Sequence, residues 1–155
     1  MSRKYNVYGV GNALVDVQYQ VNNAYISRMN VGMGTMTLVD ENRQRELIRN
    51  VSSDPLERAS GGSAANTMIG VANFGGSAYY GCKVGYDEPG DFYLNDLTAA
   101  GVDSNPNNRA EGVTGQCVVL IGPDGERSLN TFLGITEEFS PAEVEPETVS
   151  ESDIV

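Results

Sequence analysis

The segment 60–66 contains the residues best suited to binding a small molecule. It reads Ser-Gly-Gly-Ser-Ala-Ala-Asn, and its two adjacent glycines allow a ligand to approach the backbone more closely than any side chain would permit. A helix is predicted to begin here, and the first amide groups of a helix have no partner within it. Asn66, on the first turn, adds a carboxamide. We therefore predict that Gly61, Gly62, Ser63 and Asn66 bind a polyol.

Asp16 is the second residue whose type suggests binding chemistry. It is the polar member of the apolar run 14–17. A carboxylate presents two acceptor oxygens side by side, so it can accept hydrogen bonds from two neighbouring hydroxyls of a sugar. Asn12, expected on the same strand face, would share this task. The alternative interpretations are that Asp16 is a solvated strand residue and that the glycines mark only a helix start.

Several other chemistries are disfavoured by the sequence. Gly9–Leu14 resembles the opening of a dinucleotide fingerprint, but Leu14 stands at the third glycine position and an alternating strand follows, so a nicotinamide oxidoreductase is a weak alternative. The sequence contains no Gly-Lys-Ser/Thr phosphate loop. It contains no histidine either, which excludes a Ser-His or Cys-His nucleophile and removes the commonest zinc ligand.

Length and charge limit the class of protein and its partners. The chain has 155 residues, enough for one domain, and a formal net charge of −11. This charge repels phosphate backbones and anionic lipids, so we expect no nucleic-acid or membrane partner. The start, residues 1–6, has a basic pair but no signal peptide follows it, and the expected location is cytoplasmic. Cys82 and Cys117 are expected to be buried thiols rather than a disulfide.

Alternating strands and helices predict an α/β fold with a parallel sheet. Asp40 is expected to cap a helix over 41–51, and Asp91 is the predicted cap of a later helix over 92–100. Two β excursions interrupt this alternation and are expected to pair as a lid that excludes water from the site. The predicted division is an α/β core (1–14, 40–112 and 135–155) and a β lid (15–39 and 113–134).

These motifs together resemble the N-terminal half of the ribokinase-like (phosphofructokinase B) carbohydrate kinases. The resemblance covers essentially the whole chain, and within the family it is strongest to the adenosine kinase branch and its bacterial sugar kinase relatives. The motifs that carry it are Gly11–Asp16, Met36–Asp40, Gly61–Thr67, Gly75–Gly76, Gly81–Gly85, Asp87, Gly90, Gly101–Val102, Thr114–Gly115 and Arg127–Gly134.

The resemblance implies a three-layer α/β/α core, incomplete here, with a small β-sheet lid. It also implies phosphorylation, dependent on ATP and Mg²⁺, of a primary hydroxyl on a nucleoside or sugar. Asp16 would bind ribose-type hydroxyls with help from Asn12, Gly62 and Asn66. The lid residues expected to line the base or aglycone side of the acceptor are Met36, Leu38, Cys117, Leu129 and Thr131.

The sequence departs from the family in one important respect. The second signature, Asp-Thr-x-Gly-Ala-Gly-Asp, is missing from these 155 residues. In the family its last Asp is the general base, and its glycine amides hold the developing phosphoryl charge. The expectation is therefore a fragment that has no catalytic residue and lacks the C-terminal half with the ATP site. The alternative is a non-catalytic sugar- or nucleoside-binding module.

The identity of the acceptor is left open by the sequence. An aromatic clamp would favour a nucleobase, and Tyr19 and Phe132 are the candidate clamp residues in the lid. A homodimer through the lid is a further expectation, because exposed strand edges favour pairing between subunits.

Overall fold

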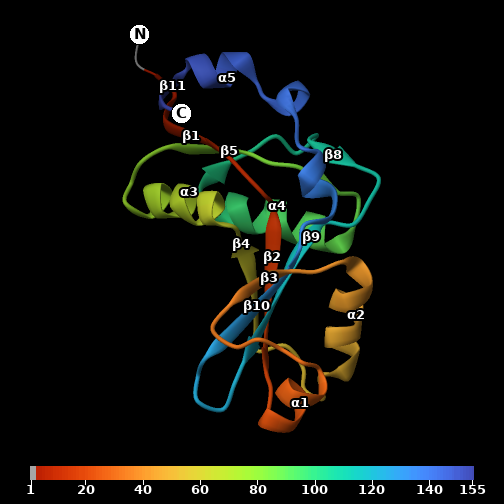
Figure 1. Ribbon diagram of the computed structural model, residues 1–155. Helices are drawn as coiled ribbons and strands as arrows, with labels where there is room; N and C mark the ends of the chain where they lie inside the picture. The colour runs from red at the N-terminus through yellow and green to blue at the C-terminus, as the bar shows by residue number, and fades with distance from the viewer. Residues whose placement is uncertain (1–2) are drawn as a thin grey trace.

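The computed structural model describes residues 3–155, which form two larger sheets of different character and one short strand pair (Figure 1). In the first sheet the strand order is β11-β1-β5-β7, and every neighbouring pair is parallel, as predicted. Residues 1 and 2 of the predicted core segment 1–14 lie outside the described residues. The strands are β1 (Tyr5–Val10), β5 (Ala78–Gly81), β7 (Val102–Asp103) and β11 (Ser152–Ile154).

Helices lie on both sides of this parallel sheet. On one side α3 (Ser63–Asn73) and α4 (Glu88–Ala99) pack against it, and α5 (Pro146–Ser150) lies on the other (Figure 1). The predicted start of α4 was wrong. Asp87 caps this helix by accepting a hydrogen bond from the amide of Gly90, whereas Asp91 lies inside it. The helix begins earlier because Pro89 is compatible with its first turn.

The second sheet contains five strands in the order β3-β10-β9-β2-β4. The two predicted excursions do pair, since β2 lies parallel to β9 and β3 lies parallel to β10. The segment 40–112, expected in the core, also contributes β4, which pairs antiparallel with β2. The strands are β2 (Leu14–Gln20), β3 (Met36–Leu38), β4 (Glu57–Gly61), β9 (Gly115–Ile121) and β10 (Arg127–Phe132).

Helices α1 (Asn23–Arg28) and α2 (Glu41–Asn50) cover one face of the five-stranded sheet (Figure 1). The expected cap of α2 is confirmed, because Asp40 accepts a hydrogen bond from the amide of Arg43 at 2.7 Å. Successive residues of a strand point to opposite faces. In β2, Val15 and Val17 are therefore buried in the core that these helices share, and Asp16 points to the open face.

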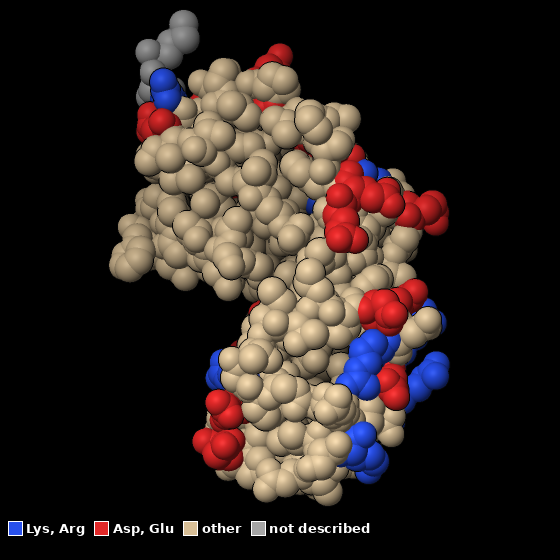
Figure 2. All heavy atoms as spheres, viewed as in Figure 1, with Lys and Arg blue, Asp and Glu red and all other residues tan. Residues whose placement is uncertain are grey.

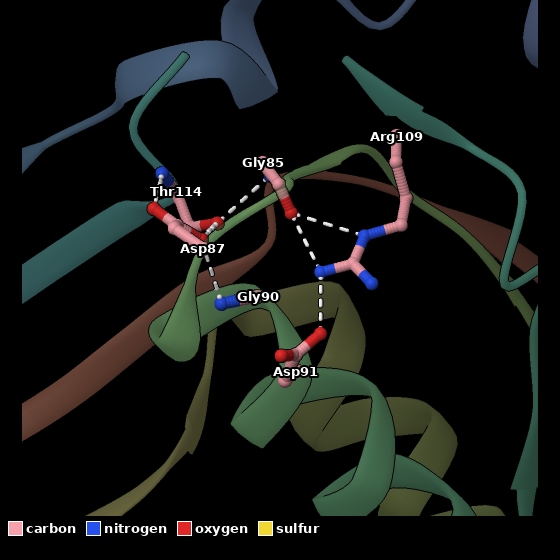
Figure 3. Close-up of polar contacts among 6 residues, drawn as sticks. All are labelled: Gly85, Asp87, Gly90, Asp91, Arg109 and Thr114. Carbon is pink, nitrogen blue, oxygen red and sulfur yellow. Dashed lines mark hydrogen bonds and ion pairs between the residues drawn. The ribbon is translucent and has the colours of Figure 1, made fainter. Parts of the chain in front are cut away.

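A short parallel pair, β6 (Val84–Gly85) and β8 (Arg109–Ala110), lies where the two sheets meet. Here the Asp87 carboxylate accepts hydrogen bonds from the amide and the hydroxyl of Thr114, at 2.8 and 2.5 Å (Figure 3). The same hydroxyl accepts a hydrogen bond from the amide of Gly85 at 2.8 Å. Because Thr114 immediately precedes β9, Asp87 ties the base of this strand to the first turn of α4.

Arg109 adds further hydrogen bonds between β6 and α4 at this junction. Its guanidinium donates two hydrogen bonds to the carbonyl of Gly85, at 3.0 and 2.8 Å, and one to Asp91 at 2.7 Å (Figure 3). The 3₁₀ turns Gly134–Glu138 and Pro141–Glu143 then return the chain to the parallel sheet.

The thiols of the chain lie inside the fold. Cys82 and Cys117 are both buried and free, as predicted. Within residues 3–155, no helix combines the length and the apolar character needed to cross a bilayer. On the face shown in Figure 2, basic side chains gather over α2, and most of the upper part is uncharged.

Candidate functional site

A cavity of about 410 Å³ lies where the open face of the five-stranded sheet meets the start of α3. This volume falls within the range of roughly 300–1,000 Å³ that is typical of small-molecule sites. All the sequence-predicted binding residues except Gly61 line it, although their role in binding stays a prediction. The lining residues are Asn12, Leu14, Asp16, Met36, Leu38, Gly62, Ser63, Asn66, Cys117, Leu129, Thr131 and Leu133.

Asp16 is the only ionisable carboxylate among these lining residues, and none of them is a lysine or an arginine. Burial raises the pKa of its carboxyl group from the usual 3.8 to about 6, because the charged form loses water. Within residues 3–155 no cation forms an ion pair with it. A desolvated carboxylate of this kind is well suited to accept hydrogen bonds from the hydroxyls of a ligand.

Gly61 lies directly against the Asp16 side chain instead of lining the cavity. A β-carbon on Gly61 would come within 2.3–2.4 Å of the carboxylate carbon and both of its oxygens, far closer than atoms can approach. Position 61 therefore has to be glycine for the carboxylate to lie where it does. The sequence predicted a binding role for Gly61, and the structure gives this residue a supporting position.

Gly62 is the N-cap of α3 and has a left-handed backbone, with φ of +100°. A side chain here would be strained, and its β-carbon would lie 2.6 Å from the carbonyl oxygen of Asn12. Among the described residues no side chain accepts a hydrogen bond from the start of α3, and Gly62, Ser63 and Asn66 at this end of the helix line the cavity. This end of the helix provides hydrogen-bond donors opposite the Asp16 acceptor.

An apolar wall forms the side of the cavity that belongs to β3 and β10. Met36 and Leu38 have 60% and 61% of their surface exposed, and Leu129 has 37%. Solvent-exposed apolar side chains around a polar cavity favour a ligand that has an apolar part. The wall therefore suits the aglycone or base of an acceptor, while Asp16 and the helix start suit its hydroxyls.

Cys117 and Thr131 form the buried part of the cavity surface between Asp16 and the wall. They are paired across β9 and β10, and the Thr131 hydroxyl donates to the Cys117 sulfur at 3.4 Å. Burial raises the pKa of the Cys117 thiol, which keeps it neutral. A neutral thiol is a poor nucleophile, so Cys117 is suited to packing against a ligand and not to covalent chemistry.

Neither candidate for an aromatic clamp, Tyr19 or Phe132, lines this cavity. Tyr19 lies on the same strand face as Val15 and Val17 and is buried against the helices, away from Asp16. Phe132 is not among the cavity-lining residues; it lines an adjoining hollow that shares Leu38, Thr131 and Leu133 with the cavity. Strand alternation explains both positions, because a side chain one or three residues from a cavity-facing residue points to the opposite face.

Leu14 and Leu133 line the cavity but were missed by the sequence analysis. Each lies two residues from a predicted site residue, Asp16 or Thr131. The two-residue period of a strand was thus a signal that could have found them.

Metal binding is not indicated by the side chains of the described residues. Within residues 3–155, no group of three or more Cys, Asp or Glu side chains is arranged so that it could hold a metal ion.

Sequence comparison finds carbohydrate kinases among the proteins similar to this chain. The model of the pfkB family carbohydrate kinases matches residues 31–155. The adenosine kinase of Saccharomyces cerevisiae is 31% identical over 139 residues, which cover 85% of this chain and 40% of that protein. The guanosine-inosine kinase of Escherichia coli K12 is 27% identical over 149 residues, covering 92% of this chain and 34% of the relative.

Solved structures give the same result for the fold. A probable sugar kinase from Rhizobium etli superposes with a TM-score of 0.88 at 35% identity, covering 97% of this chain and 45% of that one. The adenosine kinase from Sinorhizobium meliloti gives 0.87 at 35% identity, with coverages of 96% and 45%. The chain therefore spans less than half the length of these relatives.

Proposed function

The chain belongs to the pfkB family of carbohydrate kinases, and from this premise we propose that it supplies the acceptor site and lid of an ATP-dependent kinase. The reaction would transfer a phosphoryl group to a primary hydroxyl of a nucleoside or a sugar. The observation that carries the proposal is the position of the Asp16 carboxylate, which shares one cavity with Gly62 and Asn66. A carboxylate opposite amide donors can hold two neighbouring hydroxyls from both sides.

The composition of the cavity supports an uncharged nucleoside as the acceptor. No lining residue is a lysine or an arginine. The phosphate of a phosphorylated sugar would therefore have no cationic side chain to pair with and would lie near the negative charge of Asp16. The exposed apolar side chains of Met36 and Leu38 instead provide a surface for a nucleobase. The adenosine kinase and guanosine-inosine kinase relatives are consistent with this preference.

The cavity does not fit ATP and Mg²⁺ as well as it fits the acceptor. A triphosphate with its metal needs several cationic or amide donors and more than one carboxylate, and the cavity offers one carboxylate and no cationic side chain. We therefore propose that ATP and its metal bind outside the described residues. The general base is assigned outside them as well.

The experiment uses the intact gene product that carries this chain. It is incubated with Mg-ATP and, in turn, adenosine, inosine, ribose and fructose 6-phosphate, and product formation is measured alongside thermal shifts with each acceptor alone. Turnover of a nucleoside supports the proposal. Thermal shifts without any turnover would favour a non-catalytic binding module. A lack of both binding and turnover across the panel contradicts the proposed function.

A further inference from the structure

Tyr93, on α4, is a buried residue with a polar group next to the acceptor cavity. Its side chain is fully buried, and its hydroxyl donates a hydrogen bond to the carbonyl oxygen of Gly61 at 3.0 Å. This bond joins the interior of the parallel core to the first of the two glycines. Tyr93 does not line the cavity itself.

Two further hydrogen bonds connect α4 to the end of β4. The Asp96 carboxylate accepts from the amide of Ser60 at 2.8 Å, and the carbonyl of Tyr93 accepts from the Ser60 hydroxyl at 3.3 Å. Helix α4 thus holds two consecutive residues immediately before Gly62. The bond from the Tyr93 hydroxyl is the last of the three along the chain and the nearest to the cavity.

The geometry of the peptide group carries this constraint to the cavity surface. Residues 3–155 contain no cis peptide bond, so the carbonyl of Gly61 and the N–H of Gly62 belong to one planar unit and point in opposite directions. Because the carbonyl points toward the buried Tyr93 hydroxyl, the N–H points away from the interior. Gly62 lines the cavity on that side.

A peptide between two glycines needs an external constraint to keep one orientation. Glycine has no β-carbon, and its backbone rotates more freely than that of any other residue. Both flanking glycines are enforced by close contacts with Asp16 and Asn12, so they cannot be replaced by stiffer residues. Pairing with Leu14 across β2 and β4 holds the Gly61 side of this peptide in the sheet, and the hydrogen bond from Tyr93 adds a second restraint from the helix side.

We propose that Tyr93 is a positioning residue that fixes the Gly61–Gly62 peptide, so that the Gly62 N–H is directed at an acceptor hydroxyl. This inference rests on the proposed function, in which the cavity binds the hydroxyls of the acceptor. Tyr93 acts through the peptide and touches neither substrate nor reacting atoms.

A matched control exists for a purely structural role. Tyr25, on α1, is also buried, and its hydroxyl donates to the carbonyl oxygen of Leu47 at 2.9 Å. Tyr93→Phe and Tyr25→Phe each remove one hydroxyl from a buried tyrosine, and with it one hydrogen bond to a backbone carbonyl. Only the first change affects the acceptor cavity.

The kinetic test compares the two variants in the intact protein. We expect both to lower the thermal midpoint, because each removes a buried hydrogen bond. Tyr93→Phe is expected to raise the acceptor KM about tenfold with a smaller change in kcat, a loss equivalent to one weakened hydrogen bond. Tyr25→Phe should leave the KM unchanged. Equal KM values for wild type and Tyr93→Phe, in a protein that turns over a nucleoside, would overturn the inference while the proposed function stands.

A second measurement does not depend on activity. In protein labelled with ¹⁵N-glycine, the amide resonance of Gly62 should move in Tyr93→Phe and stay in place in Tyr25→Phe. If no acceptor binds the wild type, the proposed function fails, and this spectrum still decides whether Tyr93 holds the peptide. An unmoved Gly62 resonance in Tyr93→Phe contradicts the inference.

A wild-type measurement covers the case in which Tyr93→Phe does not fold. The hydroxyl proton of Tyr93 should exchange slowly with water and show a nuclear Overhauser effect to a proton of Gly61. A rapidly exchanging hydroxyl without that effect would exclude the positioning role.

Discussion

The carboxylate of Asp16 lies directly over the α-carbon of Gly61, in the space that any side chain at position 61 would occupy. The two residues are on neighbouring antiparallel strands, β2 and β4. A β-carbon at position 61 would approach all three carboxylate atoms to within 2.4 Å. The absence of one side chain therefore determines where the carboxylate that lines the cavity lies, and this relationship leads to the first prediction.

Replacing Gly61 by alanine should displace the Asp16 carboxylate and weaken acceptor binding. We expect an increase in the acceptor KM of about tenfold or more, because small displacements of positioning groups carry large costs in rate and affinity. Steady-state kinetics and acceptor titration measure it. Gly70→Ala is the control, since no atom lies within 4 Å of a β-carbon there and α3 should tolerate or favour alanine. Unchanged KM in Gly61→Ala would show that the carboxylate does not hold the acceptor.

Acceptor binding should depend on pH through Asp16. Its pKa is raised to about 6 by burial, so the carboxylate loses its charge as the pH falls through 6. A protonated carboxyl group cannot accept with both oxygens. We expect the acceptor KM to rise about tenfold per pH unit below pH 6, measured over pH 4.5–8. A flat profile through this range would contradict the assignment.

The same carboxylate should reduce stability at neutral pH. The folded pKa lies above the ordinary 3.8, so the folded state binds a proton more tightly than the unfolded state between pH 4 and 6. The contribution of Asp16 to stability is therefore favourable at low pH and is lost as the pH rises through 6. Asp16→Asn should raise the free energy of unfolding at pH 7 by about 1 kcal/mol, after allowing for partial solvent screening.

Chemical denaturation of wild type and Asp16→Asn at pH 7 and pH 4 measures this difference in the free energy of unfolding. The stability gained by the variant at pH 7 should disappear at pH 4. Acceptor binding by Asp16→Asn should be lost at both values. A destabilised Asp16→Asn variant at pH 7 would mean that the carboxylate has a stabilising partner in solution.

The Asp87 junction should contribute more stability than an ordinary helix cap. Asp87→Ala removes the acceptor for the amide of Gly90 and for both the amide and the hydroxyl of Thr114. We expect a loss of about 2–4 kcal/mol, because partly buried donors are left without partners. Asp40→Ala, which removes the cap of α2 alone, should cost only about 1 kcal/mol. If urea unfolding gives equal losses of unfolding free energy for Asp87→Ala and Asp40→Ala, Asp87 contributes no more than an ordinary helix cap.

The apolar wall should discriminate between acceptors. Leu38→Ala is expected to raise the KM for adenosine by about three- to tenfold, because it removes apolar surface that the base would cover. The KM for free ribose should stay the same. Leu56→Ala is the control, since Leu56 is also 61% exposed but lies outside the cavity. An equal effect of Leu38→Ala on both acceptors would mean that the wall does not contact a base.

Local sequence patterns predicted much of the fold. The period-two alternation of Val15, Val17 and Tyr19 indicated the lid strand, and Asp40 marked the start of α2. Both signals act over a few residues, so they can be read from the chain without knowing its tertiary contacts. The pairing of strands β2 and β9, about a hundred residues apart, followed from their similar character.

The errors came from side-chain direction and from ambiguous caps. Tyr19 and Phe132 were considered as an aromatic clamp by residue type, although strand alternation turns them away from Asp16. Asp87 and Asp91 are both acceptable caps in isolation. Asp87 is the observed cap, and it also accepts a hydrogen bond from Thr114, a residue from a distant part of the chain.

By itself the sequence determined the kinds of group available: a diglycine before a helix, a carboxylate in an apolar strand, and no histidine. Only the tertiary structure decided which groups meet. It placed Gly61 against the Asp16 carboxylate, and it brought the Tyr93 hydroxyl within hydrogen-bonding distance of the Gly61 carbonyl. Strand pairing and helix packing bring together such residues, which are distant along the chain. Burial then shifts the pKa of Asp16, since desolvation is a property of the folded surroundings and not of the residue.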